Sequence, residues 1–142
     1  MVHLDTEEIR GRVALIVDTD EDALKVRAAE LRALGLEVLT ADSTAAALAE
    51  LELSAIDLAV IELVLEQSDG GFTLSYLFKK QRPELPILIT SRVTFEAGLD
   101  FDTYTAEERR WIKADGWLER PYRQEQLVRE VRRLLHHHRA AA

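Results

Sequence analysis

The sequence contains no cysteine, which excludes disulfide bonds, thiol catalysis and cysteine-ligated metals and fits a cytoplasmic protein. No apolar run approaches the ~20 residues of a membrane-spanning helix. The early acids Asp5, Glu7 and Glu8 are unlike a signal peptide. Basic residues are also scarce, with 18 lysines and arginines against 26 acids and a net charge of −8. An acidic surface argues against nucleic acid as a direct partner, so we expect a one-domain globular protein without a membrane or nucleic-acid partner.

The most informative stretch of the chain is 58–62, which is apolar until its last residue, Glu62. A short continuous apolar run is typical of a strand that is buried on both faces of a parallel sheet. Burying an unpaired carboxylate costs several kcal/mol, so we expect Glu62 to lie where the strand emerges, at its C-terminal end. Comparable runs predict four further strands, over 13–17, 36–41, 86–91 and 116–121.

Helical spacing of apolar residues predicts a helix after each strand. The expected helices cover 22–34, a segment from Asp42 or Ser43 to Leu53, a segment from Phe72 to Pro83, 106–113, and a closing segment from Tyr122 to Leu135. Strands alternating with helices predict an α/β fold, a doubly wound five-stranded parallel sheet with helices on both faces. We expect an N-terminal arm over 1–12, the domain over 13–135 and a tail over 136–142.

Polar residues follow the predicted strands at the edge where ligands bind in open α/β sheets. The candidate site residues are Asp18, Thr19, Glu62, Ser91 and Arg120. Asp20, Glu21 and Asp22 could supply a substitute metal ligand, but acids also favour a helix N-terminus without any metal. Ser91 could bind a phosphoryl group or hydrogen-bond the end of its strand.

Four segments of the sequence resemble the receiver domain of two-component response regulators, the CheY-like family. They are Leu15–Asp18, Asp57–Leu63 with Asp69 and Gly70 after it, Pro86–Ser91, and Gly116–Tyr122. The resemblance covers 12–135 and implies a flavodoxin-like sheet of order 2-1-3-4-5. It also implies a cis peptide bond before Pro121.

In this family two acids after the first strand and an aspartate after the third hold Mg²⁺, and that aspartate takes a phosphoryl group from a histidine kinase. A hydroxyl after the fourth strand and a lysine after the fifth bind the phosphoryl group. Asp18 and Ser91 fit this pattern, whereas Thr19, Glu62 and Arg120 replace the second acid, the aspartate and the lysine. Asp18 and Glu62 remain as possible Mg²⁺ ligands, although Arg120 favours a planar pairing with a carboxylate.

We therefore predict an atypical receiver without enzymatic activity or a required cofactor, whose partner is a histidine kinase or a downstream signalling protein. In this interpretation Arg120 reaches Glu62, or an acid of the first loop, and aspartate phosphorylation is lost. Three alternatives stay open: Glu62 accepts the phosphoryl group itself, Glu62 imitates a phosphorylated aspartate, or the chain is a flavodoxin-like binder of a small molecule. The chain is either a stand-alone regulator or a fragment of a larger one.

Aromatic residues gather late in the chain, where Tyr104 and Trp111 fall in a long connection over 93–115. Trp117 matches the position of the family's switch aromatic, or it is a fixed core or interface residue. The resemblance implies that the fourth helix, fifth strand and fifth helix form the partner face, and we expect a symmetric dimer there. Two patterns are set aside. Asp57 precedes its strand and so lies at the opposite edge, and consecutive histidines at 136–138 cannot share one helix face to chelate a metal.

Overall fold

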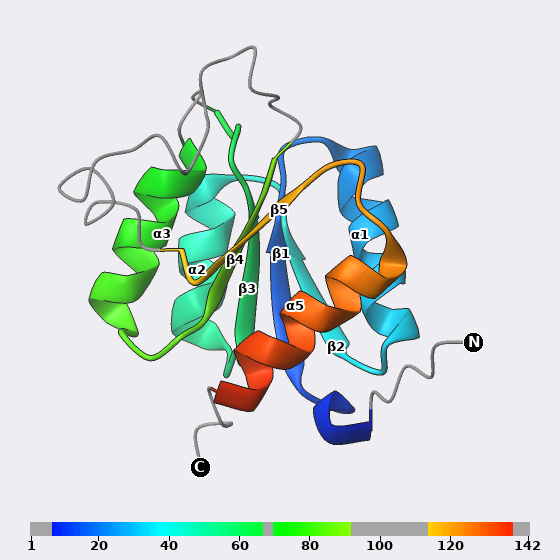
Figure 1. Cartoon of the computed structure of the whole chain (residues 1–142). Coiled ribbons are helices and arrows are strands. Elements are labelled where there is room, and N and C mark those ends of the chain that lie inside the picture. Colours follow the sequence, from blue (N-terminus) through cyan, green and yellow to red (C-terminus); the bar gives the residue numbers. More distant parts are fainter. Residues whose placement is uncertain (1–6, 67–69, 92–113, 138–142) are drawn as a thin grey trace, which may run out of the picture.

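The computed structural model describes residues 7–66, 70–91 and 114–137. One all-parallel sheet runs through the molecule in the order β2-β1-β3-β4-β5, which confirms the predicted fold class (Figure 1). Its strands are β1 (Val13–Val17), β2 (Glu37–Ala41), β3 (Leu58–Glu62), β4 (Ile87–Ser91) and β5 (Gly116–Glu119).

A short 3₁₀ helix and four α-helices surround the sheet within the described residues. They are η1 (Glu7–Ile9), α1 (Glu21–Ala33), α2 (Thr44–Leu53), α3 (Gly70–Gln81) and α5 (Gln124–His137). The helix predicted over 106–113 lies outside the described residues. In the described ranges, every helix is too short or too polar to cross a lipid bilayer.

Two hydrophobic cores lie on opposite faces of the sheet. The core under α1 and α5 takes Val60 from β3, whereas the core under α2 and α3 takes its neighbour Ile61. Consecutive strand residues point to opposite faces, and here both faces are covered by helices (Figure 1). This is why 58–62 is apolar without alternation, and all five of its residues are buried.

Helix boundaries follow from side-chain caps. The Asp20 carboxylate accepts hydrogen bonds from the backbone N–H groups of Asp22 (3.0 Å) and Ala23 (3.3 Å), so this acid of the first loop caps α1. Gly35 follows the helix with a φ of 93°, a left-handed conformation that glycine adopts easily. Of the two cap candidates for α2, the structure selects Ser43, whose Oγ accepts from Ala46 N at 3.0 Å.

A second cap of α2 comes from the loop after β3. The Glu66 carboxylate accepts hydrogen bonds from the Thr44 backbone N–H at 2.8 Å and from the Thr44 hydroxyl at 2.6 Å. The Thr44 hydroxyl, followed by its N–H, holds the pKa of Glu66 below its usual value. The loop that leaves β3 is thereby attached to the start of α2.

We expect Glu66→Ala to lower the free energy of unfolding by about 0.5–1 kcal/mol at pH 7, because an exposed cap contributes modestly. The lowered pKa places this contribution above pH 4.5, the ordinary value, and the contribution disappears as the pH falls through the folded-state pKa. Urea titrations at pH 7 and pH 3 measure the difference. Glu52→Ala, an exposed acid of the same helix, is the matched control and should change little. An equal loss at both pH values would contradict the cap.

Candidate functional site

Glu62 is the last residue of β3, as predicted, but it does not emerge into water, because its side chain is only 3% exposed. The carboxylate can stay buried because it has partners, and the contact with Arg120 is the one that the sequence interpretation expects. Arg120 Nη2 forms an ion pair with Glu62 Oε2, and the Thr90 hydroxyl donates to the same oxygen at 3.2 Å. A paired and hydrogen-bonded charge avoids much of the cost of burial.

Arg120 is held in place by the strand before it. β5 pairs with β4 so that Ser91 lies opposite Glu119, and the backbone N–H of Arg120 donates to Ser91 O at 2.7 Å. The Arg120–Pro121 peptide bond is cis, as the resemblance predicts. The side chain is 12% exposed, and its buried Nε has no hydrogen-bond partner within the described part of the chain. The guanidinium therefore reaches Glu62 from an almost fully buried position.

Asp18 brings a second carboxylate to the C-terminal ends of the strands, near Glu62. It follows β1, is 4% exposed, and its Oδ1 accepts from Asp20 N at 2.9 Å. Burial raises the pKa of Glu62; Arg120 lowers it in part, and repulsion from Asp18 raises it further. The cluster thus holds two carboxylates and one guanidinium, and protonation of Glu62 relieves its excess negative charge.

The structure leaves two of the predicted site residues outside this cluster. Thr19 is exposed and lines a groove between α1 and β2. Ser91 is fully buried and follows Thr90 in β4, so its side chain points to the other face of the sheet. The hydroxyl beside Glu62 is that of Thr90, which was not among the predicted site residues. The pairing register of β3 with β4 would have identified this contact, because Thr90 is the residue opposite Glu62.

Trp117 lies on the opposite face of β5 from Leu118, away from the Glu62 cluster. It is half-buried and packs against Phe72, with ring centroids 5.8 Å apart. Tyr104 and Trp111, the other two aromatics assigned to a switch or interface, lie outside the described residues.

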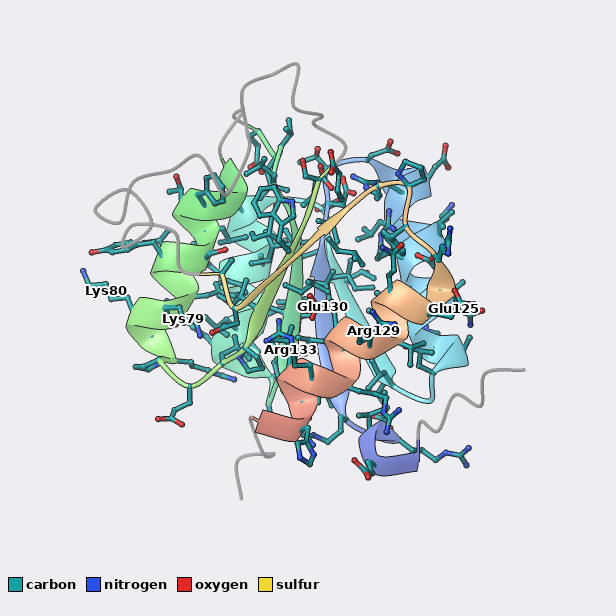
Figure 2. All side chains as sticks on the ribbon, in the orientation of Figure 1. Lys79, Lys80, Glu125, Arg129, Glu130 and Arg133 are labelled. Atoms are coloured by element: carbon teal, nitrogen blue, oxygen red, sulfur yellow. The ribbon has the colours of Figure 1, made fainter. Side chains whose placement is uncertain are left out.

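The face predicted for partners is described only on β5 and α5. Figure 2 shows charged side chains along α5, those of Glu125, Arg129, Glu130 and Arg133. Arg133 pairs with Glu130 at 2.7 Å and donates to Asp115 O at 2.9 Å. The dimer expected on this face stays a prediction.

Asp57 and His136, the first of the consecutive histidines, lie at ends of strands and helices that are far from Glu62. Asp57 Oδ2 accepts from Val13 N at 2.8 Å, which ties it to the opposite edge of the sheet, as predicted. His136 Nδ1 lies 3.8 Å from Glu8 Oε2. Over residues 7–66, 70–91 and 114–137, no three histidine, aspartate or glutamate side chains gather as a metal site would require.

A polar cluster connects α1 with the residue that follows Pro121. The Tyr122 hydroxyl donates to Glu30 Oε1 at 2.8 Å and accepts from Arg27, which also pairs with Glu30 at 3.2 Å. The Arg27 guanidinium lies 5.2 Å from the centre of the Tyr122 ring. Burial, opposed by the nearby Arg27 charge, raises the pKa of Tyr122 to about 12, so the phenol stays protonated at neutral pH. This cluster fastens the segment carrying Arg120 to α1.

The sheet order, the helices on both faces and the acidic strand ends together define a CheY-like flavodoxin fold. The sequence profile of the response regulator receiver domain matches residues 14–132, and the chain belongs to this family. Receiver domains are signalling modules of two-component systems.

Relatives agree with this assignment. The heme response regulator HssR of Staphylococcus aureus is 29% identical over 122 residues, which cover 85% of this chain and 50% of HssR. The chain therefore spans about half the length of the curated relatives it matches. A CheY-like receiver from Methanospirillum hungatei shares the fold at 21% identity, with a TM-score of 0.74 over 90% of this chain and 96% of that one. NtrX of Brucella abortus is 26% identical, with a TM-score of 0.75 over 89% of this chain and 27% of NtrX.

Proposed function

We propose that this chain is an atypical receiver that acts in the cytoplasm through protein contacts, with aspartate phosphorylation lost. The observation that carries the proposal is the buried ion pair between Arg120 and Glu62. It places a fixed positive charge where other family members are expected to hold Mg²⁺ and a phosphoryl group. A histidine kinase or a downstream signalling protein is the proposed partner.

The side chains present do not fit Mg²⁺. This ion requires near-octahedral oxygen ligands and is usually held by carboxylates and water. Of the two buried carboxylates, Glu62 is already paired with a guanidinium, and Thr19 offers no charge where the second acid is expected. Arg120 cannot give up its proton at any physiological pH, so the competing cation is permanent.

Glu62 is also a poor phosphoryl acceptor in this setting. One of its carboxylate oxygens accepts hydrogen bonds from both Arg120 and Thr90, which lowers its nucleophilicity. Its side chain is one methylene longer than aspartate, and displacement of a nucleophile by about 1 Å can cost about 100-fold in rate. Losing the metal removes the charge neutralisation on which phosphoryl transfer depends.

We expect the chain to remain unmodified when incubated with Mg²⁺ and acetyl phosphate. The matched variant is T19D/E62D/R120K, which restores all three replaced positions and should gain modification by about 100-fold or more. Intact mass followed by peptide mapping measures both. A stable adduct on Glu62 of the unaltered chain would contradict the proposal and favour the alternative in which Glu62 is the acceptor.

Magnesium binding supplies an independent readout in the same two proteins. With Trp111→Phe as the background, Trp117 fluorescence should not respond to millimolar Mg²⁺ in the otherwise unaltered chain. Because Trp117 lies on the other face of the sheet, the restored variant is the positive control for whether this signal reports the site. Isothermal titration calorimetry on both proteins gives the affinity directly.

A further inference from the structure

The outer strands of the sheet are β2 and β5. β5 has neither proline nor lysine among its four residues, although Arg120 and Pro121 follow it directly and proline is a common guard of exposed edges. β2, at the other edge beside α1, has neither proline nor lysine among its five residues (Figure 1). Its side chains are mostly half-buried or exposed. An unprotected edge strand is a template for pairing with another strand.

The hydrogen-bond register shows which backbone groups of β2 are available. Glu37 N donates to Arg12 O at 2.9 Å and Ala41 O accepts from Asp18 N at 3.2 Å, so residues 37, 39 and 41 pair with β1. In a parallel ladder the intervening residues direct their N–H and C=O groups to the other side. Within the described residues no strand pairs with Val38 and Thr40 on that side.

A groove of about 650 Å³ runs beside this edge, between α1, the end of β2 and the start of α2. Its apolar lining comes from Leu24, Ala28, Ala41 and Ala46. Its charged residues are Glu21, Lys25, Arg32 and Asp42. The edge therefore offers backbone hydrogen bonds, apolar contact and charges of both signs together.

The charges are partly separated along the edge. Glu21 and Asp42 lie at the C-terminal end of β2, where Lys25 pairs with Glu21 at 3.8 Å and leaves Asp42 as the second acid. Arg32 lies at the N-terminal end, where Arg32 O accepts from Gly35 N at 2.9 Å. Residues 21–32 of α1 cover about 16 Å at 1.5 Å per residue. A five-residue strand covers about the same length. If a second copy places its β2 antiparallel to β2 of the first, its Arg32 therefore lies at the same height along the strands as Glu21 and Asp42 of the first copy.

We propose that two copies of this chain pair β2 with β2 in antiparallel orientation, around a two-fold axis at Leu39. Val38 of each copy then lies opposite Thr40 of the other, and each such pair exchanges two backbone hydrogen bonds. Both residues are β-branched, which favours cross-strand packing. Arg32 meets Glu21 and Asp42 twice, once on each side of the axis. A self-complementary patch of this kind forms a closed dimer.

Sedimentation equilibrium of the full chain tests the dimer, and Thr40→Pro is the decisive variant. The Thr40 N–H points away from β1, so proline removes an intermolecular hydrogen bond and leaves the β1–β2 ladder intact. We expect a concentration-dependent dimer for the unaltered chain and a monomer for Thr40→Pro, with unchanged circular dichroism. Thr40→Val keeps the N–H and the β-branched shape and should dimerise like the unaltered chain.

A charge exchange tests the orientation of the two copies. Arg32→Glu turns the attraction to Glu21 and Asp42 into repulsion on both sides of the axis and should weaken dimerisation about tenfold. The triple variant E21R/R32E/D42R should restore it, because both acids that face position 32 are then basic. A monomer at all concentrations would overturn the proposal. So would a dimer that survives Thr40→Pro but is lost in Arg129→Glu, because Arg129 lies on α5 (Figure 2).

Discussion

Arg120→Met is expected to lower the free energy of unfolding by about 3 kcal/mol at pH 7, because it leaves the Glu62 carboxylate buried without its cation. Methionine keeps much of the length of the side chain, so lost packing contributes little. Removing Arg120 also removes the main influence that lowers the pKa of Glu62, so that pKa rises further. Urea denaturation followed by circular dichroism measures the loss.

The pH dependence of this variant gives a sharper test than the loss itself. A carboxyl whose folded-state pKa is raised binds a proton more tightly in the folded protein, so its destabilising effect is full above the folded-state pKa and is relieved as the pH falls towards 4.5. Arg120→Met should therefore be less damaging at pH 5 than at pH 7. The double variant R120M/E62Q should recover most of the stability at pH 7. Equal losses at both pH values, with no recovery in the double variant, would show that the ion pair is not the cause.

Gly71→Ala is expected to cost about 3 kcal/mol, because an added methyl group would overlap main-chain atoms that cannot move freely. A Cβ at this position would lie 2.5 Å from Glu62 O and 2.6 Å from Leu63 Cα. Gly71 N also donates to Leu63 O at 2.7 Å, so the start of α3 is pressed against the end of β3. Relief of the overlap requires the backbone that carries Glu62 to shift.

Gly70→Ala is the matched control for this prediction. Its Cβ would lie 3.0 Å from the Leu65 Cβ and 3.6 Å from the nearest backbone atom, so a small adjustment is enough. Thermal and urea unfolding should show that Gly71→Ala is much less stable than Gly70→Ala. Similar stabilities for the two variants would show that the contact between α3 and β3 is looser than the structure has it.

Much of the fold can be predicted because strands buried on both faces leave a simple signature. The runs 13–17 and 58–62 match β1 and β3 to the residue. The same signature hides which face a side chain occupies, since no alternation is visible. That is why Thr90, which contacts Glu62, could not be distinguished from Ser91 by pattern alone.

Contacts between segments that are far apart in the sequence are harder to predict. Glu66 reaches Thr44 across 22 positions and Tyr122 reaches Glu30 across 92, and neither spacing leaves a periodic trace in the sequence. The contact between Arg120 and Glu62 was foreseeable because both follow parallel strands and carry opposite charges. Gly71 was missed because its role depends on backbone packing at one junction and not on any side-chain chemistry.

The hydroxyl of Tyr122 connects the segment that carries Arg120 to Arg27 and Glu30 of α1, so we expect the Arg120–Glu62 pair to be thermodynamically linked to that helix. One residue separates Arg120 from Tyr122, and Tyr122 is held by Glu30 and Arg27 of that helix. Withdrawal of Arg120 from Glu62 would therefore pull on these contacts. The coupling between two such sites is reciprocal. A protein that binds α1 and displaces Glu30 would weaken the Arg120–Glu62 ion pair. Opening of the ion pair would strengthen the binding of that protein by the same free energy.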